Sequence, residues 1–582
     1  MARDGCMNRG FFIWSICALL GATVLMSCAP AEPAASQRTS SPANQAETAR
    51  PVQLIRIANQ EEPVHLSPKP PGGAYIPRLI PRLFNAELTY QDERQAYHPE
   101  LAEQLPQLGT DSWQVFPDGQ METTFRLKPN LTWHDGTALS VEDFVFAFQV
   151  YGSADLGQAR AAPQGMMRDV VARDARTVVI RWRELYPGAD SLARGSGSFG
   201  APFPPLPRHI LEEPLQRGNP DAFATHAYWS AEYVGLGPFR LDRWERGAFL
   251  EASAFDGYVL GRPKLDRIRI VFRSDPNTIV ANFLAGEVDL NAEEALRLEH
   301  GLILRREWEA RGAGVVQFFV SGGRRMNVQF HPERVKAPAL LDLRVRRALA
   351  LAIDKEALNQ ALFDGFGPPA ETWAQPSDEI FPDIQRVITR YPYDLRLAGQ
   401  QLADAGYTKG PDGIYTSATT GRLEMQLTYA ADPQYDKEAA ILADGLKQAG
   451  IDISINGLSR AQWRDPAARA EFSALMIQGG GELENLYGAS EIPTPQNRYA
   501  GNNRGSWLSS EYDRLQDAFG VTLDRLQRKT QLVQMAKIVS EEIPAIPLNY
   551  TGKVVAYVPR LHGVIPEDRI GGYWNVHLWE LR

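Results

Sequence analysis

Apolar and polar positions follow two patterns in the middle of the chain, one typical of strands and one typical of helices. Ile268, Ile270 and Phe272 alternate with arginines, which predicts a strand with one face toward solvent. Residues 278–285 have the composition of a short helix, and Gly286 follows them, as is common just after a helix. This segment therefore predicts a strand followed by a helix.

The same reading predicts elements on both sides of this segment. A helix is predicted within 341–358, with Asp342 as its N-cap and apolar residues at helical spacing. The arginines at 344, 346 and 347 are predicted to lie on its solvated face. Two further helices, beginning at Asp394 and Asp436, alternate with strands, which predicts a partly parallel sheet. Strands are also predicted at 54–58, 177–182, 314–320, 326–330, 423–429, 451–455, 472–477, 543–549 and 553–559.

Short motifs occur in a fixed order along these elements. They are Trp133-His-Asp-Gly136, Val234-Gly-Leu-Gly-Pro-Phe239, Pro263-Lys-Leu-Asp266, Leu284-Ala-Gly-Glu-Val-Asp289 and the helix from Asp342 to Asp354. The ordered set resembles the extracytoplasmic solute-binding proteins of ABC importers, in the peptide/nickel-binding family. The resemblance extends from about residue 54 to about residue 560.

The resemblance implies an α/β fold of two lobes, the periplasmic-binding-protein or Venus-flytrap fold, with mixed sheets. Two passages of the chain between the lobes would allow hinge closure on a ligand. We expect the following regions: first lobe 51–90, 205–315 and 549–582; an extra subdomain inserted in the first lobe, 91–204; second lobe 316–548.

The N-terminal residues are typical of an export signal. Residues 11–27 are uncharged and mostly apolar, too short for a membrane-spanning helix and about right for a signal peptide. They end in Leu25-Met-Ser-Cys28, which resembles a bacterial lipobox with lipidation on Cys28. We expect a lipoprotein signal peptide at 1–27 and, because 28–50 is rich in Ala, Pro and Ser, a flexible tether there. A plain secretory signal or an uncleaved anchor is the alternative.

Composition narrows the class of protein. With 582 residues the chain is too long for one core, and its net charge of −9 argues against a nucleic-acid partner. Two of its three cysteines lie in the expected signal peptide and the third is Cys28, so the body would contain no disulfide. We expect an extracytoplasmic, lipid-anchored monomer, in the periplasm or on the outer face of the cytoplasmic membrane.

Candidate ligand-binding residues come from approximate position in the family pattern. They are Glu62, Trp373, Trp463, Gly480, Gly481 and Glu482. Peptide-binding relatives usually have an aromatic residue and an aspartate near 478–486, and that aspartate often pairs with a peptide's amino group. This chain has three glycines followed by Glu482, so ordinary peptide recognition is in question. Glu482 as a surface residue is the alternative interpretation.

Motifs that would indicate catalysis are weak. The run Gly195-Ser-Gly-Ser-Phe-Gly200 fits a dinucleotide fingerprint, but no strand precedes it and prolines follow it. His134 is interpreted as a structural turn residue, and His209 with Glu212 lacks the two-histidine zinc spacing. We expect no catalytic residues, no metal site and no cofactor.

The predicted function is a substrate-binding lipoprotein that delivers a solute to an ABC permease and its ATPase. An oligopeptide is the first candidate ligand. An oligosaccharide, an opine-like compound or a metal chelate is the alternative within this class, and a lipid-anchored hydrolase is the alternative outside it. Aromatic residues, including 12 tryptophans, suit stacking on sugars or rings, although most tryptophans belong to cores.

Overall fold

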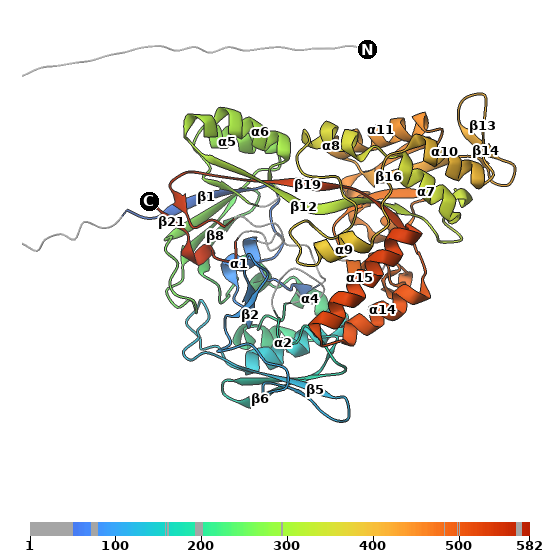
Figure 1. The fold of residues 1–582 in the computed structure, drawn as a ribbon. Helices are drawn as coiled ribbons and strands as arrows, with labels where there is room; N and C mark the ends of the chain where they lie inside the picture. Colours follow the sequence, from blue (N-terminus) through green and yellow to red (C-terminus); the bar gives the residue numbers. More distant parts are fainter. Residues whose placement is uncertain are drawn as a thin grey trace, which may run out of the picture. The chain divides into compact units, whose positions relative to one another are not determined.

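A mixed sheet of ten strands extends through the computed structural model (Figure 1). The strand order is β17-β16-β18-β12-β19-β11-β1-β10-β9-β8, and parallel pairs occur in both halves. The structure describes residues 51–71, 79–156, 159, 162–192, 202–292, 295–481, 483–497, 499, 501–565 and 573–582. Of these, Val52–Arg582 form one compact unit.

The strands of this sheet include most of the strands expected from the sequence. Their bounds are β1 (Leu54–Asn59), β8 (Phe239–Glu245), β9 (Phe249–Ala254), β10 (Arg267–Phe272), β11 (Leu290–Asn291), β12 (Val315–Val328), β16 (Glu424–Ala430), β17 (Asp452–Leu458), β18 (Leu475–Gly479) and β19 (Ala545–Tyr557).

Two long strands, β12 and β19, join the halves of the sheet. They pair antiparallel along nearly their whole length, from Val315 opposite Tyr557 to Asn327 opposite Ala545. At one end β19 pairs with β11, and at the other end β12 pairs with β18. The sequence predicted two shorter strands in place of each one. We call this pair the crossover ribbon, and the regions beyond its two ends the first lobe, with β1 and β8–β11, and the second lobe, with β16–β18.

The crossover ribbon contains a bulge in its middle. Ser321 lies opposite Thr551 and Gly323 lies opposite Tyr550, so Gly322 is an extra residue on β12. The Thr551 hydroxyl donates to the carbonyl oxygen of Gly322 at 3.1 Å. The bulge and the glycines interrupt the apolar alternation, which explains why the sequence predicted two strands here.

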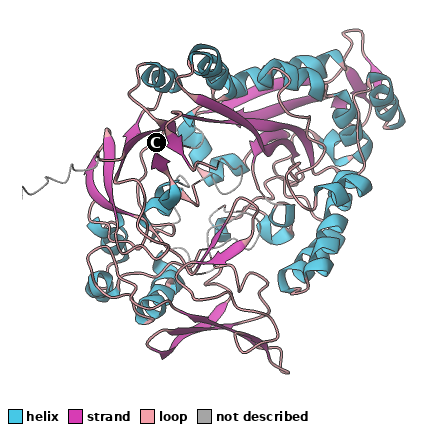
Figure 2. Cartoon of the chain, turned by 60° about the vertical axis from the view of Figure 1, so that its left-hand side comes forward, coloured by secondary structure: helices cyan, strands magenta, loops and turns pink. Residues whose placement is uncertain are grey.

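Helices pack on both faces of the sheet (Figures 1 and 2). α5 and α6 contact each other beside the first-lobe end of the crossover ribbon, and α7, α8, α10 and α11 pack against the second lobe. On the opposite face, α9, α14 and α15 form a separate core with Trp373, Tyr487 and Trp507. The bounds are α5 (Pro276–Leu284), α6 (Leu298–Glu307), α7 (Leu343–Ala352), α8 (Lys355–Phe363), α9 (Phe381–Val387), α10 (Leu395–Asp404), α11 (Pro433–Gln448), α14 (Ser510–Val521) and α15 (Arg525–Glu542).

A second sheet lies in the region expected to be an inserted subdomain. Its order is β4-β5-β7-β6, and its buried residues belong to the same core as the first lobe. The remaining elements are β2 (Thr89–Gln91), β3 (Tyr97–Pro99), β4 (Trp113–Val115), β5 (Met121–Arg126), β6 (Met167–Asp174), β7 (Thr177–Trp182), β13 (Thr408–Lys409), β14 (Tyr415–Ser417), β15 (Gly421–Arg422), β20 (Leu561–His562), β21 (Glu580–Leu581), α1 (Leu79–Phe84), α2 (Glu142–Gly152), α3 (Arg208–Gln216), α4 (Pro220–Ala224), α12 (Arg460–Arg464) and α13 (Pro466–Ala470).

Two helix predictions need correction. The pattern within 341–358 spans α7 and α8, and the N-caps of these helices are Asp342 and Asp354. The helix expected from Asp436 begins four residues earlier, where Asp432 caps α11 and proline occupies the first helical position. An Asp-Pro pair fixes a helix start more strongly than an aspartate already inside the pattern, because proline suits that first position.

One arginine of α7 departs from the predicted solvated face. Arg346 is buried and donates to the carbonyl oxygens of Leu340, Leu341 and Glu542 at 2.8–3.0 Å. Burial lowers the pKa of its guanidinium to about 10. It therefore ties the start of α7 to the end of α15, whereas Arg344 is exposed beside Asp342.

Two of the sequence motifs meet in the first lobe. His134 of the Trp-His-Asp-Gly turn accepts from the Gly235 amide at 3.2 Å and contacts the Gly237 carbonyl oxygen at 3.0 Å. Burial lowers the pKa of His134 to about 4, so the neutral ring is the stable form. This position confirms the structural interpretation of His134 and explains why both motifs occur in one chain.

Candidate functional site

Three of the predicted ligand-binding residues lie close together in the second lobe. The Gly480 carbonyl oxygen accepts from Nη1 of Arg325, which projects from the crossover ribbon. Gly480 and Gly481 have φ angles of +75° and +93°, and a Cβ on Gly481 would lie 2.3 Å from Leu486. Only glycine allows the loop to lie this close to Arg325 and Leu486.

Aromatic side chains pack beside this glycine loop. Trp373 and Tyr487 meet edge to face with ring centroids 5.6 Å apart, and Tyr487 also contacts Trp507 and Tyr512. Arg325 lies within electrostatic range of the Tyr487 hydroxyl. Gly480 and Gly481 therefore lie against a buried arginine, and Trp373 packs on Tyr487 beside it.

Trp463 is linked to Arg325 through two further arginines, Arg469 and Arg504. It lies on α12, and the guanidinium of Arg469 is 5.9 Å from its ring centroid. Arg469 and Arg325 both lie within electrostatic range of Arg504. We call Arg325, Arg469 and Arg504 the arginine row, since it extends from Trp463 to the glycine loop.

The arginine row has an unusual charge balance. Burial and mutual repulsion lower the pKa of Arg504 to about 10, and burial also lowers the pKa values of Arg325 and Arg469. Among the described residues no carboxylate lies within 4 Å of these guanidinium groups. The row was not predicted from the sequence, because its members are 35–179 positions apart. The one local signal was an arginine pair inside an otherwise apolar strand.

Glu62 has partners in the first lobe. Its carboxylate accepts from the Trp244 indole at 2.8 Å and from the Gly247 amide at 2.9 Å, with Arg246 at 3.6 Å. These contacts hold the turn between β8 and β9. Cys28 and Glu482 lie outside the described residues, so their roles stay predictions.

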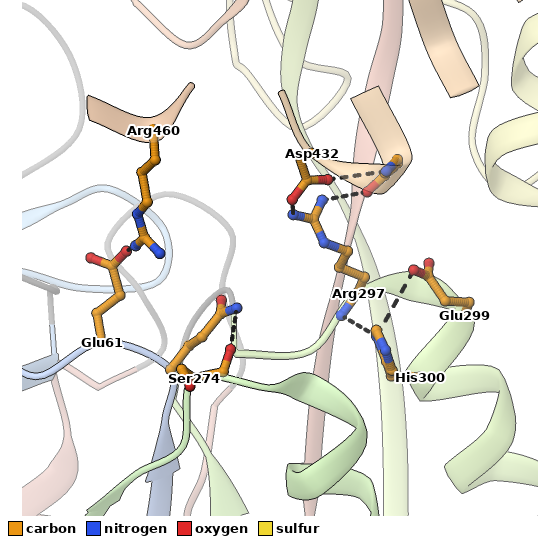
Figure 3. A network of polar contacts seen from close by, with 9 residues as sticks. Glu61, Ser274, Arg297, Glu299, His300, Asp432 and Arg460 are labelled. Carbon is orange, nitrogen blue, oxygen red and sulfur yellow. Dashed lines mark hydrogen bonds and ion pairs between the residues drawn. The ribbon is translucent and has the colours of Figure 1, made fainter. Parts of the chain in front are cut away.

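The two lobes contact each other through charged side chains (Figure 3). Arg297, the N-cap residue of α6 in the first lobe, donates to Asp432 at 2.8 Å and to Gln434 at 2.5 Å at the start of α11. Glu61, which follows β1, pairs with Arg460 and lies 3.7 Å from Arg464, both on α12. Asp190, in the region expected to be the inserted subdomain, is 3.8 Å from Arg525 at the start of α15. The lobes are thus fastened at three separate places.

The first of these contacts extends to the crossover ribbon. Tyr435 of α11 has the Arg297 guanidinium 5.5 Å from its ring centroid and the Arg324 guanidinium at 3.9 Å. Arg324 also donates to Glu438 of α11 at 2.9 Å, and both side chains are buried. The first turns of α11 therefore contact both Arg297 of the first lobe and Arg324 of the crossover ribbon.

Replacing Arg297 by glutamine is expected to shift the protein toward separated lobes. The side chains of Arg297 and Asp432 are 28% and 29% exposed, and such a pair contributes up to about 1 kcal/mol, or up to about fivefold in the ratio of closed to open forms. The shift is measured by energy transfer between dyes on one engineered cysteine in each lobe. The Arg306→Gln control removes a pair within the first lobe. Equal transfer in both variants would contradict a fastening role for Arg297.

The described residues contain neither a candidate metal site nor a helix suited to cross a membrane. No group of three or more His, Cys, Asp or Glu side chains there is arranged to hold a metal ion. Within the same residues, no helix combines the length and apolarity that crossing a bilayer requires.

Comparison with known proteins gives relatives that are described as peptide-binding, oligopeptide-binding or heme-binding proteins. The putative ABC transporter peptide-binding protein of Brucella ovis is 27% identical over 343 residues, 59% of this chain and 58% of that protein. The match thus spans less than two thirds of that relative's length. The oligopeptide-binding protein AppA of Bacillus subtilis is 24% identical over 519 residues, 86% of this chain and 87% of that protein.

Solved structures show the same fold. The oligopeptide-binding protein of Thermus thermophilus, complexed with a pentapeptide, superimposes with a TM-score of 0.73 at 22% identity, covering 91% of this chain and 96% of that one. NikZ of Campylobacter jejuni, in complex with Ni(L-His), gives 0.71 at 20% identity, covering 91% and 99%. The predicted two-lobe α/β fold is confirmed.

A family model matches more than half of the chain. It describes the middle region of bacterial extracellular solute-binding proteins, family 5, and it matches residues 98–491. The matched residues contain the sequence motifs from the Trp-His-Asp-Gly turn to α7, strand β12 of the crossover ribbon and the glycine loop. This chain belongs to the bacterial extracellular solute-binding proteins of family 5.

Proposed function

We propose that this protein is the substrate-binding receptor of an ABC importer, which holds a solute between its lobes and presents it to the permease. One observation carries the proposal: the lobes are joined by the crossover ribbon and fastened by ion pairs that can separate without disturbing either core. A ligand that contacts both lobes would stabilise this fastened form. The fastened form would then be the one that the permease recognises.

An oligopeptide is the first candidate ligand. Support comes from the relatives named above, two of which are described as peptide- or oligopeptide-binding proteins, and from the fold shared with a pentapeptide complex. Trp373, Trp463 and the glycine loop at Gly480 and Gly481 would form the second-lobe wall. The aromatic rings would contact apolar ligand groups, and the glycines would expose backbone for hydrogen bonds.

A metal chelate, an opine-like compound or an oligosaccharide is the alternative ligand. The observation that favours it is the arginine row, which adds positive charge beside the glycine loop and would suit an acidic ligand. NikZ shows that this fold also accommodates a nickel–histidine complex. A hydrolase is the least supported alternative, since the family consists of solute-binding proteins.

Native mass spectrometry of the purified protein, before and after mild unfolding, tests the proposal. A set of small peptide masses released on unfolding would support the oligopeptide receptor and give its length preference. A single non-peptide mass would retain the receptor and replace its ligand. Turnover of ester or peptide substrates that one substitution abolishes would contradict the receptor role.

Lipidation of Cys28 is a separate proposal about location. We expect Cys28→Ser to release the protein from membranes, because the tether that follows contains no apolar segment that could anchor it. The measurement is the distribution of the full-length protein between membrane and soluble fractions. Cys17→Ser, inside the expected signal peptide, is the control. Continued membrane attachment of the Cys28 variant would contradict lipidation at this residue.

A further inference from the structure

The arginine row differs from the other buried arginines of this protein. Arg324 pairs with Glu438, and Arg346 donates to three carbonyl oxygens. Arg325 and Arg504 are 2% and 6% exposed, yet no carboxylate accompanies either among the described residues. Burying a charged group without a counterion costs several kcal/mol. Among the described residues, Arg325 and Arg504 thus carry buried charge that no carboxylate neutralises.

Buried hydrogen-bond donors without partners occur at the same place. Nη2 of Arg325 and both Nε and Nη1 of Arg504 are buried and have no partner in the structure. The hydroxyl of Ser506, two residues after Arg504, is also buried without a partner. Guanidinium nitrogens present N–H groups in a planar fork that matches a carboxylate or phosphate. The group that such donors select is an oxyanion.

The position of the row suits a ligand held between the lobes. Arg325 donates to the glycine loop beside Trp373, and Arg469 lies against Trp463. The helix that bears Trp463 also bears Arg460, which contacts Glu61 of the first lobe. The row thus extends from the glycine loop to a place where the lobes meet.

We propose that Arg325 and Arg504, supported by Arg469, bind an acidic group of the transported ligand, a carboxylate or a phosphate. This inference rests on the proposed receptor function and narrows its ligand to an anionic class. The oxyanion would accept from the free nitrogens of both guanidinium groups and would neutralise the row. An arginine that only anchored the glycine loop would need no second arginine beside it.

The first test measures thermal unfolding of the full-length protein in chloride, acetate and phosphate at equal ionic strength and pH. We expect a saturable rise in Tm of about 2–3 °C with the preferred oxyanion, since a ligand that binds only the folded state stabilises it. A larger response to acetate would identify a carboxylate, and a larger response to phosphate would identify a phosphate. Equal Tm values in the three salts would overturn the proposal.

Two variants separate binding from a structural role. Arg504→Met is expected to abolish the oxyanion response and to raise Tm in chloride, because a buried unpaired charge is removed. Arg504→Lys should retain part of the response. Arg217→Met, at an exposed ion pair at the end of α3, should respond like the wild type. A fall in Tm of Arg504→Met in chloride, with the response unchanged, would show that the arginine is structural.

The receptor function and this inference can fail separately. Native mass spectrometry establishes whether any solute is carried, and its mass and charge show whether that solute is acidic. A neutral or purely cationic solute would overturn the anionic site and leave the receptor intact. An enzyme activity with an intact oxyanion response would overturn the receptor and leave the site.

Discussion

Glu438→Gln is expected to lower the free energy of unfolding by about 3–5 kcal/mol, because it leaves the buried guanidinium of Arg324 without its carboxylate. Glu438 is 1% exposed, and Arg324 donates to both of its oxygens. Glutamine preserves the size of the side chain, so packing changes little and loss of charge dominates. The measurement is the midpoint of urea unfolding, converted with a common slope.

Two comparisons isolate the charge effect of Glu438. Glu424→Gln removes an exposed carboxylate 4.0 Å from Arg422 and should change stability by less than about 0.5 kcal/mol. The double variant Arg324→Met with Glu438→Leu should recover most of the lost stability, since an apolar pair replaces the ion pair. A Glu438→Gln midpoint equal to that of Glu424→Gln would show that Arg324 finds other compensation.

Gly237→Ala is the second change with a large expected effect. A Cβ at this position would lie 2.3 Å from the Asn85 amide nitrogen, 2.4 Å from the Phe84 carbonyl carbon and 2.6 Å from the Leu83 carbonyl oxygen. All three are backbone atoms, which cannot rotate away as a side chain does. We expect a loss of about 3 kcal/mol or more in the free energy of unfolding.

The matched control for Gly237→Ala is Gly152→Ala at the end of α2. No atom lies within 4 Å of the new Cβ there, so stability should stay constant or rise by up to about 1 kcal/mol. Both variants are compared by urea unfolding, with the ring nitrogen resonances of His134 as a local probe. Equal stability of the two variants would mean that the segment after α1 moves to make room.

The sequence predicted what short-range physics determines. The strand at Arg267–Phe272 and the helix that ends before Gly286 follow from alternation and capping within ten residues. The first residue of α11 was wrong by four positions, because two aspartates compete for one cap. The predicted lobe limits at 315–316 and 548–549 fall within β12 and β19, and they stay predictions.

The candidate site was less predictable than the fold. Trp373, Gly480 and Gly481 were named as ligand-binding residues only through the family pattern, and that role stays a prediction. Arg325, which donates to the glycine loop, follows Arg324 directly, yet the two arginines have different partners. Successive strand residues face opposite sides of a sheet, so one arginine meets α11 and the other meets the glycine loop. Sequence spacing could not show which of the two arginines has a carboxylate partner among the described residues.

The glycines of the crossover ribbon have a mechanical consequence. Gly322 and Gly323 lie at the bulge, and Gly552 on the facing strand lies opposite Val320. Because glycines have no side chains to collide, the crossover ribbon can bend at this point while the two lobes keep their shape. Bending at such a point costs little energy. The angle between the lobes is then set by the charged contacts between them. The ligand and these charged contacts would then stabilise the closed form together, so substitutions at the contacts could tune affinity without changing the crossover ribbon.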